Sequence, residues 1–254
     1  PLHEVLESAR SLDVEIARLE ASGGDPDVIE KKRQLMEQID GMSEQNPMLG
    51  LRGCRLAIKF PILPEMQVRA IATAAAQLKK EGLDPKPEIM IPLVSVVPEL
   101  AKLRELAEKI IAEVAEEQGV ELEIPVGTMI ELPRAAVTAD EIATQADFFS
   151  FGTNDLTQTT FGFSRDDVEA EFIPQYLAER ILPYNPFATV DPGVAKLVKM
   201  GVELGHQGNP DIVCGVCGEH VGDPDSVKKA GVLIQDGVHE EDVIDWSEFV
   251  IETE

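Results

Sequence analysis

The spacing of hydrophobic residues predicts two amphipathic helices at the start of the chain. Apolar side chains recur every three or four positions through residues 2–42, which is the stripe that one face of a helix buries. Two glycines, an aspartate and a proline at residues 23–26 interrupt this stripe, as expected of a turn. We therefore expect a helical hairpin with charged outer faces over residues 1–45.

From about residue 50, short apolar runs alternate with helical patterns. The predicted strands lie at residues 54–60, 88–94, 124–130, 148–151 and 211–216, and the predicted helices at 65–81, 98–118, 139–146 and 194–204. Gly82 and Gly119 follow two of these helices, at the position where a left-handed residue often ends a helix. Parallel strands need crossover connections of this length, because a tight turn joins only antiparallel neighbours. The pattern therefore predicts an α/β fold with helices covering a parallel sheet.

Two architectures fit this alternation, an open doubly wound sheet and a β/α barrel. No glycine-rich dinucleotide fingerprint follows a strand, which weakens the first. Polar residues instead stand at successive strand ends: Glu131, Asn154, Asp155 and Cys217 each close an apolar run, and Arg52 precedes the first run. Loops converge at that edge of both architectures, so we expect an active site there.

Two carboxylates at neighbouring strand ends predict a magnesium site. Glu131 and Asp155 offer the hard oxygen ligands that Mg²⁺ prefers, and Mg²⁺ keeps positions open for substrate oxygens and water. Like charges this close need a cation between them. The alternative is that Arg134 or Arg165 neutralises the pair without a metal.

The segment 152–155 (GTND) follows an apolar strand and opens a predicted helix. Its backbone N–H groups and the Asn154 amide would suit an anion, although Asn and Asp are also ordinary helix caps. Arg165 lies beyond that helix, and its planar guanidinium suits a phosphoryl group. The alternative for Arg165 is a surface ion pair with Asp166 or Asp167.

The cysteines near the last strand allow three interpretations. We prefer a single working thiol, Cys217, at the strand end, with Cys214 buried in the strand as a small hydrophobic residue. A zinc site would combine Cys214, Cys217 and His220, with His206 as the candidate fourth ligand. A redox Cys-x-x-Cys is the third choice, because such pairs normally begin a helix rather than lie in a strand.

The amino-acid composition limits the kinds of partner and location that we expect for the chain. Asp and Glu number 47 against 22 Lys and Arg, a formal net charge of −25, so nucleic acid and anionic membrane surfaces are not expected partners. No apolar stretch reaches 18 residues, and no signal peptide is visible. Three cysteines cannot form a disulfide framework in 254 residues, which favours a reducing, cytoplasmic location. Because the first residue is Pro1 rather than Met, we expect the sequence to begin inside a longer polypeptide.

Several long motifs resemble one enzyme family. They are NPMLGLRGCRL at 46–56, GTMIELPRAA at 127–136, FSFGTNDLTQ at 149–158, FGFSRDD at 161–167 and CGEH at 217–220. In this order and spacing, residues 1–227 resemble the C-terminal phosphoenolpyruvate/pyruvate domain of pyruvate, phosphate dikinase, one of the phosphoenolpyruvate-utilising enzymes. The resemblance implies a (β/α)8 TIM-type barrel.

The resemblance also implies a role for each site residue. Glu131 and Asp155 would ligate Mg²⁺, and Cys217 would be the proton donor. Four consecutive residues would line the pyruvate site, and two arginines would face phosphoryl or carboxylate groups; these are Gly152, Thr153, Asn154, Asp155, Arg52 and Arg165.

The implied activity is a reversible phosphotransferase reaction. A phosphohistidine on a separate domain would donate its phosphoryl group to the enolate of pyruvate, as part of the conversion of ATP, pyruvate and phosphate to AMP, phosphoenolpyruvate and diphosphate. The implied partners are pyruvate or phosphoenolpyruvate, the phosphohistidine and ATP-binding domains, and a second subunit in a homodimer. The resemblance leaves an organelle of a eukaryotic parent open as the location.

The chain departs from the family pattern at both ends of the predicted barrel. Five predicted strands are too few for eight, and the acidic segment 228–254 lacks the closing strand of the family. We therefore treat residues 1–254 as one incomplete barrel domain, with a helical hairpin at 1–45, βα units at 46–227 and a divergent tail. Such a piece would not run the complete reaction. The alternatives are a non-catalytic fragment and a zinc-binding module.

Overall fold

The computed structural model describes residues 9–42, 46 and 48–222 of the chain. The chain divides into two compact units, Pro1–Arg52 and Gly53–Glu254, which are described separately. In the first unit, helices α2 (Ala9–Ala21) and α3 (Pro26–Met42) pack against each other, which confirms the predicted hairpin within the described residues. The predicted tail at 228–254 lies outside the described residues.

The second unit is built on a parallel sheet. Its strands are β1 (Ile89–Ile91), β2 (Val126–Ile130), β3 (Phe148–Gly152) and β4 (Val213–Cys217), in the spatial order β1-β2-β3-β4. All three neighbouring pairs are parallel and follow one another in sequence, which confirms four of the predicted strands. The order never reverses, unlike that of a doubly wound sheet. The described residues thus form a sheet of four adjacent parallel strands, and the predicted eight-stranded barrel stays a prediction.

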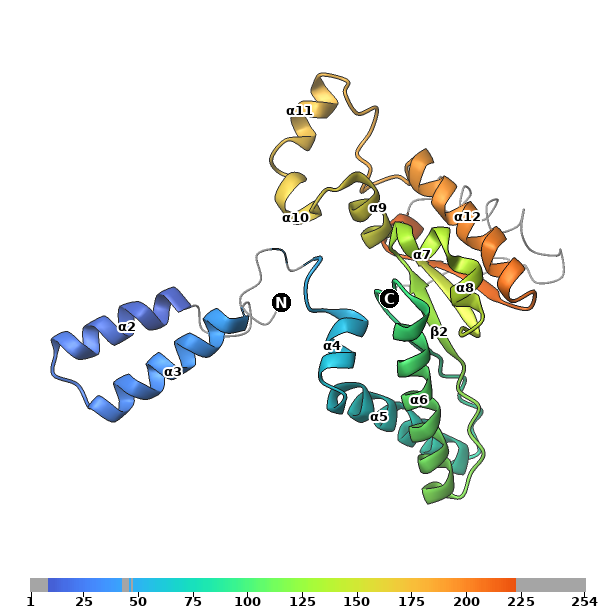
Figure 1. Ribbon diagram of the computed structural model, residues 1–254, viewed down its shortest axis with the longest axis horizontal. Helices are drawn as coiled ribbons and strands as arrows, with labels where there is room; N and C mark the ends of the chain where they lie inside the picture. The colour runs from blue at the N-terminus through green and yellow to red at the C-terminus, as the bar shows by residue number, and fades with distance from the viewer. Residues whose placement is uncertain (1–8, 43–45, 47, 223–254) are drawn as a thin grey trace. The chain divides into compact units, whose positions relative to one another are not determined.

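Helices fill the connections between the strands (Figure 1). These connecting helices are α6 (Val97–Gln118), α7 (Pro133–Val137), α8 (Ala139–Ala143), α9 (Thr153–Phe161), α10 (Arg165–Val168), α11 (Ile173–Ala178) and α12 (Pro192–Gly208). Helix α5 (Ile62–Lys80) precedes β1, and the 3-10 helix η1 (Glu219–Gly222) follows β4. The predicted helices are confirmed, with shifted ends. Gly82 and Gly119 take the predicted left-handed conformation, at φ of 84° and 64°.

The first predicted strand was wrong, because residues 54–60 mostly form helix α4 (Gly53–Lys59). Cys54 is fully buried, and Ala57 and Ile58 pack against the same core, so the apolar positions are spaced by three and four. That spacing is helical, but a short apolar run cannot be assigned by periodicity alone. The amide of Cys54 donates to the carbonyl oxygen of Pro92 after β1, which anchors the start of α4 beside the sheet.

The two faces of the sheet differ in burial. One face is covered by the helices and carries a core that includes Ile130, Phe149 and Phe151, whose two phenyl rings meet edge to face. On the other face, Met90 and Val213 remain 37% and 66% exposed. Side chains alternate along a strand, so every second residue of β3 and β4 belongs to this less covered face. Gly152 of β3 and Cys217 of β4, described below, belong to it.

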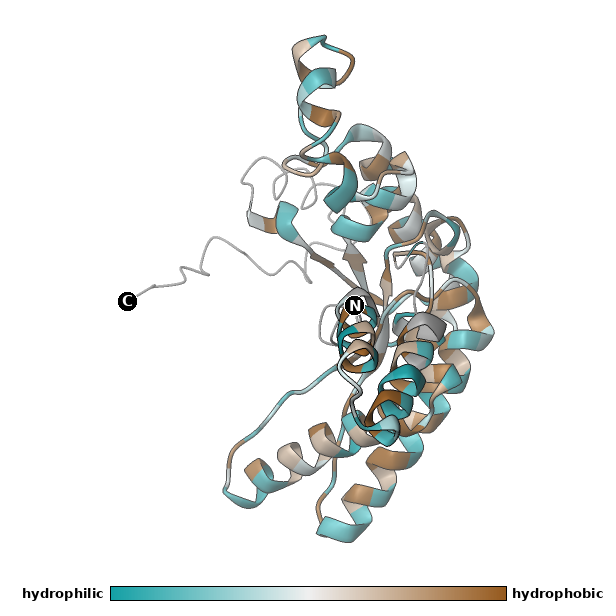
Figure 2. Cartoon of the chain, turned by 90° about the vertical axis from the view of Figure 1, so that its left-hand side faces the viewer, coloured by the Kyte–Doolittle hydropathy of each residue, from teal (hydrophilic) through white to brown (hydrophobic). Residues whose placement is uncertain are grey.

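The helices of the described structure are amphipathic. Hydrophobic and hydrophilic residues interleave along them in Figure 2, and α12 packs its apolar side against α7 and α8 while α6 packs against α4 and α5. Among the described residues, we find no helix with both the length and the hydropathy that crossing a bilayer would demand.

Candidate active site

One row of residues crosses the carboxyl edge of three strands. Gly152 of β3 pairs in register with Cys217 of β4, and Ile130 of β2 pairs with Phe151 of β3. Glu131, which follows Ile130, therefore lies beside Gly152, and a Cβ added to Gly152 would lie 3.0 Å from the Glu131 Cβ. The sheet thus brings together a carboxylate and a thiol that the sequence placed at separate strand ends.

Glu131 is buried and held by a backbone amide. Glu131 is only 3% exposed, and its Oε1 accepts a hydrogen bond of 2.6 Å from the amide of Leu93. A buried carboxylate is costly unless such donors compensate for lost water. Leu93 presents its amide from a left-handed conformation, with φ of 59°, directly after β1.

Cys217 is half-buried, and its surroundings favour the protonated thiol. Burial raises the pKa of Cys217 above its ordinary value, and the negative charge of Glu131 raises it further. A hydrogen bond with the Ser150 side chain acts in the opposite direction. Ser150 was not among the predicted site residues, although strand alternation places it on the same face as Gly152.

The first turn of α9 carries the polar residues of the GTND segment. The Asn154 side-chain oxygen accepts from the Glu219 amide at 3.1 Å, and Asp155 Oδ1 accepts from Gln158 Nε2 at 3.2 Å. The first turn of α9 thus contacts the loop that follows β4. These contacts fix the side chains that the sequence predicted to line a pyruvate site.

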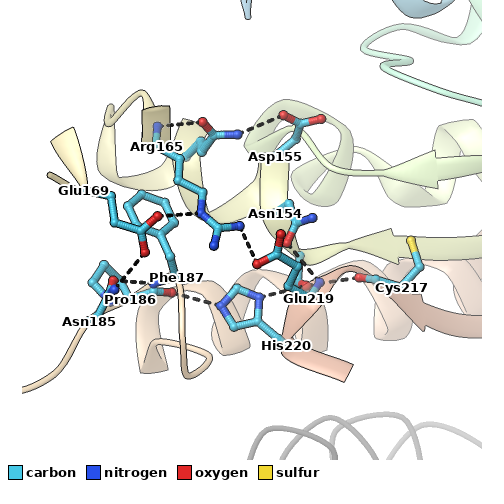
Figure 3. A network of polar contacts seen from close by, with 12 residues as sticks. Asn154, Asp155, Arg165, Glu169, Asn185, Pro186, Phe187, Cys217, Glu219 and His220 are labelled. Carbon is cyan, nitrogen blue, oxygen red and sulfur yellow. Dashed lines mark hydrogen bonds and ion pairs between the residues drawn. The ribbon is translucent and has the colours of Figure 1, made fainter. Parts of the chain in front are cut away.

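A buried histidine ties the same loop to α9 (Figure 3). His220 Nδ1 lies 2.9 Å from Thr153 Oγ1, and His220 Nε2 lies 2.9 Å from the carbonyl oxygen of Pro186. The Thr153 hydroxyl also donates to the carbonyl oxygen of Cys217 at 3.0 Å. Between them, Gly218 takes φ of 112°, and a Cβ there would lie 2.4 Å from Thr153 Oγ1.

Arg165 is engaged by two carboxylates other than those the sequence pointed to. Its Nε lies 2.9 Å from Glu169 Oε2 and its Nη1 lies 2.6 Å from Glu219 Oε2 (Figure 3). The hydrogen bonds that Arg165 donates to Glu169 and, second in size, to Glu219 raise the pKa of its guanidinium. The predicted contact of Arg165 with a phosphoryl group stays a prediction, and a phosphoryl oxygen would have to compete with these partners.

The other two arginines of the sequence hypotheses donate hydrogen bonds to backbone carbonyl groups. Arg52 ends the first unit, where its Nη1 donates to the carbonyl oxygen of Met48 at 3.5 Å, so its role towards substrate stays a prediction. Arg134 donates through Nη1 to the carbonyl oxygen of Ser95. This contact engages Arg134 with the loop after β1.

The geometry of β4 speaks against a shared zinc or redox pair. Cys214 and Cys217 are three residues apart in one strand, so their side chains leave opposite faces of the sheet, and both cysteines are free thiols. Both ring nitrogens of His220 already contact protein oxygens. Across the part of the chain that the structure describes, no three His, Cys, Asp or Glu residues are grouped to hold a metal ion.

Comparison with known proteins assigns the chain to a family. Residues 4–240 match the model of the "PEP-utilising enzyme, PEP-binding domain". The chain belongs to this family.

Several relatives carry the same name. The chain is 49% identical over 228 residues to "Pyruvate, phosphate dikinase 1, chloroplastic" of Arabidopsis thaliana, which covers 89% of the chain and 23% of the relative. It is 49% identical over 197 residues to the pyruvate, phosphate dikinase of Clostridium symbiosum (77% and 22%), and 53% identical over 195 residues to that of Flaveria bidentis (76% and 20%). The chain therefore spans less than a quarter of the length of these relatives. The family resemblance drawn from the motifs is confirmed.

The carboxylates of this PEP-binding domain suit a magnesium ion. Mg²⁺ is usually held by one or two carboxylates, and substrate oxygens and waters complete its shell. Glu131, oriented by its amide contact, and Asp155, in the first turn of α9, offer two such hard oxygen ligands from adjacent strand ends. The donor chemistry fits Mg²⁺ better than zinc, which prefers nitrogen and sulfur.

Proposed function

We propose that this chain is the phosphoenolpyruvate- and pyruvate-binding part of a pyruvate, phosphate dikinase. In this reaction a phosphoryl group passes reversibly between a phosphohistidine and the enolate oxygen of pyruvate. The relatives that carry this name and the family match support the proposal. The single observation that carries it is the row in which Glu131 and Cys217 flank Gly152.

Glu131 and Asp155 would bind and orient the metal and, through it, the substrate. The Leu93 amide donates to the Glu131 carboxylate and the Gln158 side chain donates to Asp155, which supports the proposal that both carboxylates would be oriented before substrate arrives. Bound Mg²⁺ would supply the positive charge that stabilises the enolate oxygen of pyruvate. Gly152 lets Met129 and Glu131 pack close to β3, because a Cβ there would lie 2.6 Å from Met129 Sδ and 3.0 Å from the Glu131 Cβ.

Cys217 would move the proton at the methyl carbon. Its raised pKa keeps the thiol protonated at neutral pH, which is the form that donates a proton when phosphoenolpyruvate is converted to pyruvate. In the opposite direction the thiolate form of Cys217 would take the proton from the methyl carbon of pyruvate and become the thiol. Ser150, through its hydrogen bond with Cys217, would orient the thiol and stabilise the thiolate that forms.

We further propose that the sheet is part of a (β/α)8 barrel. The unreversed strand order and the open face that bears Met90 and Val213 support this proposal, because the inner face of a barrel needs further strands to cover it. In a structure of the full-length protein we expect additional parallel strands beside β1 and β4. A solvent-exposed edge at both strands there would contradict the barrel.

The chain would supply one part of a larger reaction. Since it spans less than a quarter of its relatives, the ATP-binding and phosphohistidine domains, and the second subunit of a dimer, would come from the rest of the protein. Arg52 and Arg165 would meet the phosphoryl group or the carboxylate of the substrate in that complete enzyme.

Calorimetry of oxalate, a stable mimic of the enolate, tests the proposal. We expect oxalate to bind the chain only when Mg²⁺ is present, and Glu131→Gln to lose that binding. Glu116→Gln is the matched control, since Glu116 is exposed on α6 away from the strand ends. Equal oxalate binding with and without Mg²⁺, or unchanged binding by Glu131→Gln, would refute the proposed function.

A further inference from the structure

The turn after β1 holds a non-glycine residue in a conformation that glycine normally takes. Leu93 has φ of 59° and is 2% exposed. A left-handed conformation is unfavourable for a residue with a Cβ, so the surrounding structure must impose it. The consequence of this conformation is that the Leu93 amide points at Glu131 Oε1, 2.6 Å away.

Residue Cys54, at the start of α4, donates two hydrogen bonds to the backbone of this turn. The Cys54 amide donates to the carbonyl oxygen of Pro92 at 3.1 Å, and Cys54 Sγ donates to the carbonyl oxygen of Leu93 at 3.2 Å. Two successive carbonyl groups of the turn are thus held by one residue. Gly53 lets the helix approach, because a Cβ on it would lie 2.9 Å from the Cβ of Leu93.

The Cys54 thiol is suited to be a lasting donor rather than a reactive group. It is fully buried, and burial raises its pKa to about 12, so it carries its proton throughout the neutral range. A protonated thiol can donate a hydrogen bond, whereas a thiolate cannot. The strand-end chemistry proposed above does not use this residue.

We propose that Cys54 is a positioning residue that acts through Leu93 to orient the carboxylate of Glu131. The thiol and amide of Cys54 hold the turn after β1 in its left-handed form, and the turn amide in turn fixes the Glu131 side chain. Cys54 itself touches neither metal nor substrate. The inference rests on the proposed function in one respect, the assignment of Glu131 as a metal ligand.

Metal affinity tests the proposal through three variants of the chain. Groups that orient a metal ligand typically change affinity by roughly 10–100-fold when removed, so we expect Cys54→Ala to weaken Mn²⁺ binding, measured by electron paramagnetic resonance, by about tenfold. Cys54→Ser restores a donor to the Leu93 carbonyl and should recover most of the affinity. Cys214→Ala, which removes the half-buried thiol of β4, should bind Mn²⁺ like the wild type. Equal weakening by the Ala and Ser variants, or no weakening by either, would overturn the positioning role.

The amide proton of Leu93 gives a second readout that needs no metal. A charge-assisted hydrogen bond of 2.6 Å should shift this proton strongly downfield in a ¹H–¹⁵N spectrum of the wild type. We expect the shift to move upfield in Cys54→Ala and to return in Cys54→Ser. If the wild type bound no Mn²⁺, the proposed function would fail while this response still supported the coupling from Cys54 to Glu131. An unaltered Leu93 shift in folded Cys54→Ala would overturn the coupling alone.

Discussion

Replacing His220 by alanine should be among the most destabilising changes near the candidate active site. The imidazole is 2% exposed and bridges Thr153 and Pro186, which belong to segments 33 residues apart in the chain. In His220→Ala the Thr153 hydroxyl keeps its second partner, the carbonyl oxygen of Cys217. The Pro186 carbonyl oxygen instead loses the donor that the ring supplies.

The size of the effect follows from two contributions. A buried carbonyl left without its donor costs about 1–3 kcal/mol. The space left by the ring adds about 2 kcal/mol, the lower end of the range for large-to-alanine changes in a core. We therefore expect His220→Ala to lower the free energy of unfolding by about 3–5 kcal/mol, against a typical total of about 5–15 kcal/mol.

Urea denaturation followed by far-ultraviolet circular dichroism measures this loss, with two control variants. His220→Gln carries an amide near the position of Nε2 and can still donate to Pro186, so it should be less destabilised than His220→Ala. His206→Ala removes a half-buried histidine of α12 whose Nδ1 contacts the Pro210 carbonyl oxygen at 3.3 Å, and it should cost about 1 kcal/mol or less. If His220→Ala cost no more than His206→Ala, the bridging role of the imidazole would be refuted.

Three further predictions concern the same part of the molecule. Gly218→Ala should lower the free energy of unfolding in urea by more than about 1 kcal/mol, because φ is 112° and the new Cβ would lie 2.4 Å from Thr153 Oγ1; no loss would contradict the packing described. The Arg165 contact lowers the pKa of Glu169 below its usual 4.5, so the stability it contributes is present above that value and lost as pH falls through the lowered pKa. The stability difference between wild type and Arg165→Gln should therefore shrink in acid, and a difference that does not change with pH would rule this out. Burial raises the pKa of Cys214 to about 12, so iodoacetamide at pH 9 should label it, by peptide mass spectrometry, only after unfolding; rapid labelling of the folded chain would show the thiol to be accessible and ionised.

Much of the sheet could be predicted from the sequence because parallel strands leave a strong local signal. Apolar runs separated by helical patterns located β1 to β4, and the left-handed glycines after α5 and α6 followed from helix-ending chemistry. Residues 54–60 were assigned to a strand because seven residues hold too few turns to display a helical period. The helical form of this segment is supported by the contact of Cys54 with the turn after β1, and the local sequence pattern carries no sign of that contact.

The strand-end residues of the site could be predicted from the sequence. The residues that contact and support them could not. Glu131 and Cys217 stand directly after apolar runs, so their position alone marked them. Their supporting partners are far away in sequence: Leu93 lies 38 residues before Glu131, and Thr153 lies 67 residues before His220. Such pairs depend on strand register and loop geometry, which only the three-dimensional structure supplies.

The ion pairs of Arg165 illustrate why neighbours in sequence mislead. Asp166 and Asp167 were the alternative partners because they are adjacent, but successive residues of a helix point in different directions. Glu169 follows Arg165 by four residues, at the end of α10, so the two side chains lie on the same side of that helix. Glu219 contacts Arg165 from the loop after β4. Spacing by four was readable from the sequence, whereas the contact with Glu219 was not.

These ion pairs also bear on how an acidic chain would bind an anionic substrate. The chain carries a formal net charge of −25, and the guanidinium of Arg165 already faces the carboxylates of Glu169 and Glu219. Pyruvate or phosphoenolpyruvate would therefore approach an edge of the sheet that also bears Glu131 and Asp155. The negative charges of these carboxylates would repel the negatively charged substrate. Under the proposed function, a divalent cation reverses the sign of the local charge, which makes metal binding a condition for substrate binding rather than only an aid to the chemical step. Oxalate affinity should then rise with Mg²⁺ concentration until the metal site is filled and show no further increase beyond it, whereas oxalate binding at zero Mg²⁺ would mean that the arginines alone supply the positive charge.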